Sequence, residues 1–303
     1  MKKEHIAGRT SAIDIDGTCT GIYYLTENEI VMIDSGRTYS PELFAWLNRN
    51  RLRVKAIIHT HLHIDHIGNT YELVTKYGAE AFASDTEIRL MDYHYSDTLP
   101  DVTANADGGP VRIAYQEETG GASGNGKDVA LSGDGKNMAH STQKEAVFQT
   151  VFTPGHSIGH QMVITPDNVC FLGDAIMTEK LLRASKMPFH MDTIESLNSI
   201  EIIRNTDYRV YVASHFGIIK KHKLAEVLDK NAAKELKLYE TLRMTAKDAM
   251  TVDELADRFM KNAGVDNPDV RDLFWMQESS KRRIEEMLEI GMLVKEDGLI
   301  HRG

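Results

Sequence analysis

The chain has 303 residues, of which 42% are hydrophobic and 26% charged, with a formal net charge of −10. This composition is typical of a globular protein of about two domains, and the acidic balance disfavours nucleic acid as a general partner. No apolar run reaches the length of a membrane-spanning helix, so we expect no membrane contact.

The N-terminus and the cysteines indicate the compartment. Residues 1–7 have a basic beginning but no apolar segment behind it, so we expect no signal peptide. Cys19 and Cys170 lie far apart in strand-like apolar stretches, which favours buried thiols over a disulfide framework. These features predict a cytoplasmic protein.

The first hundred residues predict alternating strands and helices. The apolar stretches 22–26 and 30–34 flank a short polar turn, which is typical of a β-hairpin. Ser40 and Pro41 are suited to the N-cap and first position of a helix that extends to about Asn50. Further strands are predicted at 54–58 and 79–83, and further helices at 69–77 and 86–93. This order is typical of an α/β fold.

Residues 100–145 differ in composition from their surroundings. They are rich in glycine and poor in large apolar side chains, which favours turns or loop. No Lys-Ser/Thr pair that opens a helix follows a glycine cluster, so a phosphate-binding loop is disfavoured. We expect a mobile or hairpin-like insertion.

The next eighty residues again read as strands with one helix. The turn composition at 165–168 predicts a hairpin. Strands are predicted at 147–152, 161–164, 169–172 and 209–213, and a helix at 194–205.

After residue 221 the sequence becomes rich in Ala, Leu, Lys and Glu. We expect a long helix over 224–250, a second helix opened by a capping box at 251–254, and a third over 270–290 with a break near 279–280. An Asp-Gly turn in the last residues predicts a terminal hairpin. Helices followed by a small hairpin resemble a winged helix.

The densest chemical signal is at 59–66, where four histidines and one aspartate follow an apolar strand. Because residues i and i+2 of an extended chain point the same way, His61 and His63 can bind one ion. A turn after them would aim Asp65 and His66 at a neighbouring point. Imidazole and carboxylate are ligands typical of zinc. A merely histidine-rich polar loop is disfavoured, because so many buried imidazoles would lack partners.

Residues 60–66 resemble the T-H-x-H-x-D-H signature of the metallo-β-lactamase superfamily. Three later motifs follow in the superfamily's chain order. Residues 153–157 resemble T-P-G-H-[ST], residues 171–174 resemble [FL]-x-G-D, and residues 214–217 resemble an x-H-G turn with one residue inserted. The resemblance spans roughly residues 10–220 and implies an αββα sandwich. We therefore assign residues 1–221 to this fold and residues 222–303, from their helical pattern, to a winged-helix-like domain.

The resemblance also implies the ligands of two metal ions. It assigns His61, His63 and His156 to the first metal and Asp65, His66 and His215 to the second, with Asp174 as the bridge. Asp65 is also expected to orient the nucleophile or to carry its proton. Asp34 begins a stretch that resembles the superfamily's early D-[ST]-G, where the aspartate is structural, and we leave it out of the site.

Two zinc ions are the expected cofactors, with iron and manganese as alternatives. The flavodiiron oxidoreductases of the superfamily have glutamate at the place of His63, and imidazole there favours zinc. True zinc β-lactamases typically have cysteine or serine at the place of Asp174, so its presence favours another substrate.

Three further histidines lie outside this ligand set. For His160, a position behind the ligands and a contact with substrate both stay open. His59 is expected to form a hydrogen bond at the strand end. His190 lies in a loop that often contacts substrate in such enzymes, although an ordinary loop residue is the favoured interpretation.

The resulting hypothesis is a binuclear metal hydrolase that attacks a small ester, thioester or lactone with a metal-bound hydroxide. A thioester would match the glyoxalase II group. The alternative is a metal-dependent endoribonuclease or phosphodiesterase, as in part of the lactamase-β-like 2 group. An iron-dependent persulfide dioxygenase and a silent binding module are disfavoured, because the sequence retains the whole expected ligand set.

Residues 281–283, Lys-Arg-Arg, are the one candidate nucleic-acid contact in the C-terminal region. A solvated helix face is favoured, because acidic residues outnumber basic ones from Thr251 to the end. The apolar stripe of this region is expected to pack on the catalytic domain or to form a homodimer contact.

Overall fold

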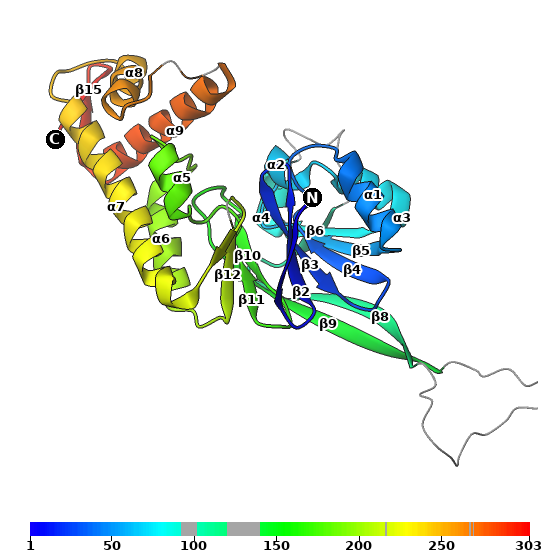
Figure 1. Cartoon of the computed structure of the whole chain (residues 1–303). Coiled ribbons are helices and arrows are strands. Elements are labelled where there is room, and N and C mark those ends of the chain that lie inside the picture. Colours follow the sequence, from blue (N-terminus) through cyan, green and yellow to red (C-terminus); the bar gives the residue numbers. More distant parts are fainter. Residues whose placement is uncertain (92–101, 120–139, 216, 267, 269) are drawn as a thin grey trace, which may run out of the picture.

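A computed structural model describes residues 1–91, 102–119, 140–215, 217–266, 268 and 270–303. Up to Ile219 the chain forms two β-sheets packed face to face, with helices on both outer faces (Figure 1). The expected αββα fold is therefore confirmed, and a helical region follows it. Within these residues, no helix combines the length and the apolarity needed to cross a bilayer.

The first sheet has the strand order β1 to β7. Its strands are β1 (Lys3–Ala7), β2 (Thr10–Ile15), β3 (Thr18–Tyr24), β4 (Glu29–Ile33), β5 (Arg53–Ile58), β6 (Glu80–Ser84) and β7 (Val102–Asn105). Strands β4 to β7 are parallel, so helices connect them: α1 (Pro41–Arg49), α2 (Ile64–Ile67), α3 (Thr70–Tyr77) and α4 (Asp85–Met91). The Ser40 hydroxyl accepts a hydrogen bond from the Leu43 N–H, which confirms the expected start of α1.

The second sheet has the order β13-β12-β11-β10-β9-β8. Its strands are β8 (Val111–Thr119), β9 (His140–Phe152), β10 (Gln161–Ile164), β11 (Val169–Phe171), β12 (Val210–Ala213) and β13 (Gly217–Ile219), with helices α5 (Glu179–Ala184) and α6 (Thr193–Arg204) after β11. The expected hairpin between β10 and β11 is confirmed, and Asn168 in its turn has a φ of 62°.

The region expected as an insertion, 100–145, contributes strands to both sheets. Strand β7 pairs with β6, while β8 and β9 form the long hairpin that projects from the sandwich in Figure 1. Val111, Ile113 and Tyr115 are buried at every second position, so β8 has one face in the core. The hairpin alternative therefore applies to β8 and β9. Their glycine-rich connection, 120–139, and residues 92–101 lie outside the described residues.

Three hydrophobic layers hold the sandwich together. The central layer lies between the sheets and includes Ile58, Phe148 and Phe171. An outer layer packs α1 and α3 on the first sheet, and the other packs α6 and the first turns of the next helix on the second sheet. Strands β4 to β7 are parallel, so they end at the same edge of the first sheet. Their loops at this edge face the loops of the second sheet.

The C-terminal region forms a further hydrophobic cluster, to which Met187 of the preceding loop also contributes. The elements of this region are α7 (Lys221–Thr245), α8 (Val252–Asn262), α9 (Val270–Glu289) and the hairpin of β14 (Leu293–Glu296) and β15 (Leu299–Arg302). The capping box of α8 and the Asp-Gly turn are confirmed, with φ of 50° at Asp297 and 81° at Gly298. The boundary at residue 221 and the likeness to a winged helix stay predictions.

The expected break in the third helix is wrong. Helix α9 is continuous through Ser279 and Ser280, because the Ser280 hydroxyl donates to the Met276 carbonyl at 2.7 Å and is satisfied inside the helix. Both cysteines are free; Cys170 is buried as expected, whereas Cys19 is only half-buried.

Candidate metal centre

The histidine-rich loop begins where β5 ends, and Asp34 at the end of β4 holds its first residues. The Asp34 carboxylate accepts hydrogen bonds from the Thr60 N–H at 2.8 Å and from the Thr60 hydroxyl at 2.9 Å. His63 has an extended backbone as the N-cap of α2, with φ −68° and ψ 149°. This change from strand to helix sends the side chains of His61 and His63 one way and those of Asp65 and His66 another.

Asp34 also contacts the metal-binding set. The His66 Nδ1–H donates to the Asp34 Oδ2 at 2.9 Å, which directs Nε2 of the ring toward Asp174. Although burial raises the pKa of Asp34, the nearby His66 and His59 hold it below its usual value, so the group is ionised. The expectation of a purely structural Asp34 missed this contact, which the Asp-Ser-Gly motif alone does not specify.

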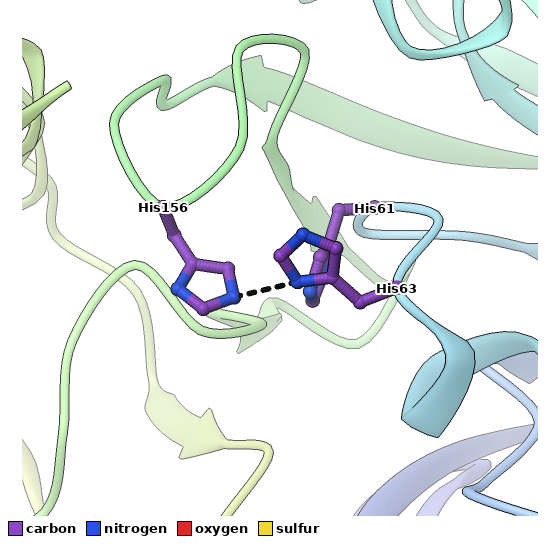
Figure 2. Close-up of side chains that lie close together, drawn as sticks. All are labelled: His61, His63 and His156. Atoms are coloured by element: carbon purple, nitrogen blue, oxygen red, sulfur yellow. Dashed lines mark hydrogen bonds between the residues drawn. The ribbon is translucent and has the colours of Figure 1, made fainter. Parts of the chain in front are cut away.

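His156 lies in the loop between β9 and β10. Gly155 has a φ of 131°, and a Cβ there would meet the Ser196 Cα at 2.4 Å, so α6 packs directly on this loop. The His156 Nδ1–H donates to the Phe189 carbonyl at 3.1 Å, which leaves Nε2 facing inward. That atom lies 2.9 Å from the His63 Nδ1, and Figure 2 shows both rings beside His61.

His160 lies behind Asp174. Its Nε2 accepts the Asp174 N–H at 3.0 Å, and its Nδ1–H donates to the Thr153 hydroxyl at 2.9 Å. A Cβ on Gly173 would lie 2.4 Å from the His160 ring, which requires glycine there. His160 is fully buried and lines neither of the cavities described below, which supports the position behind the ligands.

The structure brings the seven expected residues into two neighbouring groups. Within each group the potential ligand atoms lie within 4.8 Å of one another; the groups are His61, His63 and His156, and Asp65, His66, Asp174 and His215. Oδ2 of Asp174 lies 3.5 Å from the His156 Nε2 and 3.5 Å from the His66 Nε2. One carboxylate oxygen therefore lies between the two groups, as a bridge requires.

His215 completes the second group from the end of β12. Its Nδ1–H donates to the Gly17 carbonyl at 3.2 Å. Its Nε2 lies 3.4 Å from the Asp65 Oδ2 and 3.3 Å from the Asp174 Oδ2. The charge of Asp174 raises the pKa of His215 to about 10, so the ring carries a positive charge that a metal cation would replace.

The electrostatics of the two groups fit metal cations. Burial and the neighbouring His66 lower the pKa of His63 to about 4, and burial also lowers the pKa of His61 and His156. These rings are neutral at pH 7, which is the form that binds a metal. Among the described residues, the buried Nε2 atoms of His61 and His66 have no hydrogen-bond partner. Buried polar atoms without partners are costly, and a cation would satisfy them.

Glu87 on α4 was not singled out from the sequence, which offers no motif around it. Its buried carboxylate accepts hydrogen bonds from the Gly159 N–H at 3.1 Å, the Leu62 N–H at 3.4 Å and the Ser157 hydroxyl. It therefore connects the two loops that carry the first group. His59, as expected, forms a hydrogen bond at the strand end, with Nε2 3.1 Å from the Thr70 hydroxyl.

Two cavities adjoin the metal-binding groups, of about 430 Å³ and 730 Å³. These volumes are typical of small-molecule sites. The first contains His63, Asp65, His156 and Asp174, with walls formed by Arg37, Thr38, Ile64, Met187, Phe189, Trp275, Met276 and Ser279. His190 lines the second cavity. Its Nε2 also lies 3.3 Å from the Glu235 Oε1, so this residue connects its loop to α7.

Taken together, residues 281–283 form neither a solvated basic face nor an open surface for nucleic acid. Arg283 is fully buried, and its guanidinium lies 2.8 Å from the Glu235 carboxylate. Lys281 pairs with Asp253 at 2.8 Å, and only Arg282 is exposed. The favoured interpretation of a solvated helix face was wrong for Arg283, because the helix periodicity places it toward α7.

Comparisons with known proteins agree with this geometry. A metallo-beta-lactamase family protein from Thermus thermophilus has a TM-score of 0.67 and 17% identity, over 96% of this chain and 97% of that one. A beta-lactamase domain protein from Burkholderia ambifaria has a TM-score of 0.68 and 14% identity, over 99% and 93%. A metallo-beta-lactamase from Pontibacter korlensis has a TM-score of 0.51 and 21% identity, over 76% and 98%.

The first two likenesses cover nearly the whole chain, so the shared fold includes the C-terminal helices. No curated protein sequence matches the chain. The sequence profile of the metallo-beta-lactamase superfamily matches residues 16–215, which run from the turn before β3 to the last of the seven expected ligands. By this match over most of its length, the chain belongs to the metallo-beta-lactamase superfamily.

Proposed function

We propose that the protein is a hydrolase with two divalent metal ions, preferably zinc, that acts on a small ester, thioester or lactone. Members of the superfamily are typically metal-dependent hydrolases. The observation that carries the proposal is the position of the Asp174 Oδ2 between two groups of ligand atoms at the floor of a cavity.

We propose His61, His63 and His156 as ligands of the first ion and Asp65, His66 and His215 as ligands of the second, bridged by Asp174. The excess of imidazole over carboxylate supports zinc over magnesium or calcium. When bound, such ions supply a water of lowered pKa and polarise the substrate's carbonyl oxygen.

Asp65 is the proposed acid–base residue. It lines the first cavity and lies beside His215. Burial alone would raise the pKa of Asp65, but the hydrogen bond with His215 and the charges of His66 and His215 together lower it to about 2. The carboxylate is therefore ionised at pH 7, which is the form that accepts a proton from an attacking water. Asp34, the Phe189 carbonyl and the Gly17 carbonyl fix the tautomers of His66, His156 and His215.

A small acyl substrate is better supported than RNA. All three basic residues at 281–283 form ion pairs within the chain, and that of Arg283 with Glu235 is buried, which weakens the case for a basic surface that would hold a phosphate backbone. The proposal also includes membership of the glyoxalase II group, with a lactone as the alternative substrate, and a homodimer contact through the C-terminal region.

The test is metal quantification of the purified protein together with a panel of thioester, lactone, phosphodiester and single-stranded RNA substrates. We expect close to two transition-metal ions per chain and metal-dependent hydrolysis of an acyl substrate, lost in His61→Ala. One ion per chain that added zinc does not raise would contradict the bridged pair. Metal-dependent RNA cleavage that outpaces acyl hydrolysis, and weakens steeply with salt, would overturn the substrate class.

A further inference from the structure

We propose that helix α9 of the C-terminal region forms the substrate-binding wall of the metal site, and that Trp275 recognises an apolar group carried by the substrate. This inference rests on the proposed acyl hydrolysis and adds a determinant of its specificity. The apolar group belongs either to the acyl side or to the leaving group, and the experiment below distinguishes the two.

A row of aromatic rings extends from the metal-binding histidines to α9. The Phe189 ring lies 5.7 Å from both the His63 ring and the His156 ring, measured between centroids. Trp275 packs edge-to-face on Phe189 at 5.4 Å, and Phe274 follows at 5.1 Å. Trp275 is nevertheless 42% exposed, so much of its ring surface is open toward the cavities.

Buried contacts hold α9 against the loop that carries Phe189. The Ser279 hydroxyl donates to the His190 carbonyl at 3.2 Å, and the Arg283 guanidinium donates to the Pro188 carbonyl at 3.0 Å. Trp275, Ser279 and Arg283 are spaced by four residues and share one helix face. Because Ser279 and Arg283 are buried and hydrogen-bonded, the position of Trp275 over the site is fixed before substrate binds.

The two cavities meet at this wall. Both are lined by His63, Phe189, Trp275 and Ser279. The first continues along Met187 and Met276, and the second along Leu62, Leu90, Ile158 and Phe274. Arg37 and Thr38 make part of the first cavity polar, and its apolar side chains other than Ile64 belong to α9 and to the loop of Phe189, so an apolar group is expected to bury its surface there. The continuation into the second cavity leaves space for a longer chain.

The experiment uses two series of thioesters with the metal-loaded full chain. One lengthens the acyl group with the thiol kept constant, and the other lengthens the thiol's alkyl group with acetyl kept constant. We expect kcat/KM to rise about fourfold per methylene in one series, the value that corresponds to burying a methylene group. In Trp275→Ala this rise should shrink to twofold or less per methylene in the same series.

Two variants separate recognition from folding. Trp275→Phe should retain an intermediate slope, because it keeps an aromatic ring. Tyr71→Ala removes an aromatic side chain that is 54% exposed on α3 and lines neither cavity, and it should leave the slope unchanged. A slope that survives in Trp275→Ala, or that is absent from both series in the native protein, would overturn the proposed wall.

A binding measurement tests the wall without turnover. The chain has two tryptophans, so Trp46→Phe leaves Trp275 as the only indole. Hexanoate should shift its fluorescence at lower concentration than acetate. Calorimetric titration of the native protein and of Trp275→Ala with the same two acids should show that this preference is lost in the variant. If no thioester is hydrolysed but hexanoate is preferred, the proposed reaction fails while the apolar wall stands. If thioesters are hydrolysed without any dependence on chain length and hexanoate is not preferred, the wall fails alone.

Discussion

Among single residues, Asp174 has the most consequential position, because its Oδ2 lies within 3.5 Å of imidazole nitrogens from both groups. Asp174→Asn should lower kcat roughly a hundredfold or more, since a neutral amide compensates far less of the charge of two cations. The fold should be kept, because the residue follows β11 outside the core. Metal content, far-UV circular dichroism and turnover are the measurements. Asp207→Asn changes an exposed aspartate and is the control. Near-native turnover of Asp174→Asn would contradict the role of Asp174 as a bridge between the two ions.

Asp34 is the second residue whose role can be isolated. Asp34→Asn should weaken metal binding about 10- to 100-fold. The reason is that a neutral amide is a weaker acceptor for the Nδ1–H of His66 than the charged carboxylate. Competition with a chelator measures the affinity of each ion. The loss should fall on the second ion, bound by His66, and equal loss at both sites would show that the loop as a whole had moved.

At the scale of elements, the contact between α7 and α9 depends on a buried ion pair. Glu235 accepts from the Arg283 guanidinium at 2.8 Å and lies beside His190. Burial alone would raise the pKa of Glu235, but the charges of Arg283 and His190 lower it to about 2. A depressed folded-state pKa means that the stabilisation is present above the unfolded-state pKa of about 4.3 and is lost as the pH falls toward 2.

Glu235→Gln should therefore destabilise the protein at pH 7 by about 3 kcal/mol, because Arg283 stays buried without a charged partner. The difference from the native protein should narrow as the pH falls from about 4 toward 2. Urea unfolding at a series of pH values measures it. Glu226→Gln on the same helix removes an exposed partner of Lys223 and Lys230 and should have no measurable effect. A difference that stays constant with pH would contradict the assignment.

Elements differed in how far the sequence specified them. Helices with local end signals were predicted within a few residues, because the caps at Ser40 and Thr251 act through neighbouring backbone. The short elements α5 and β13 were not predicted, since so few residues hold no full period of apolar spacing. Strand β7 was assigned to a loop for the same reason, although pairing with β6 places it in the sheet.

At the scale of the whole molecule, the C-terminal region is expected to affect the site without providing a metal ligand. A chain that ends after Lys221 retains the seven proposed ligands but loses Leu224 and Leu228, which pack in the cluster on the second sheet. It should bind metal less stably and associate in solution, because that apolar surface becomes exposed. A chain that ends after Thr245 keeps α7 and is the matched comparison.

Both truncated chains lack Trp275 and should lose preference for apolar substrates. Size-exclusion chromatography, metal content and the thioester series distinguish the two effects. A chain ending after Lys221 that stays monodisperse with unchanged kinetics would refute a role for the C-terminal region in the site.

The sequence by itself determined the fold class, the local elements and the residues worth proposing as ligands, because these depend on short spacings: alternation in strands, caps in helices, and His-x-His before a turn. Only the tertiary structure decided which atoms meet. Asp34 and His66, Asp174 and His156, and Phe189 and Trp275 are far apart in the chain, and their distances follow from sheet pairing and helix packing. The burial of Arg283 belongs to the same class. An amphipathic pattern shows that a helix face is covered, but the partner that covers it is set by the packing of the whole chain.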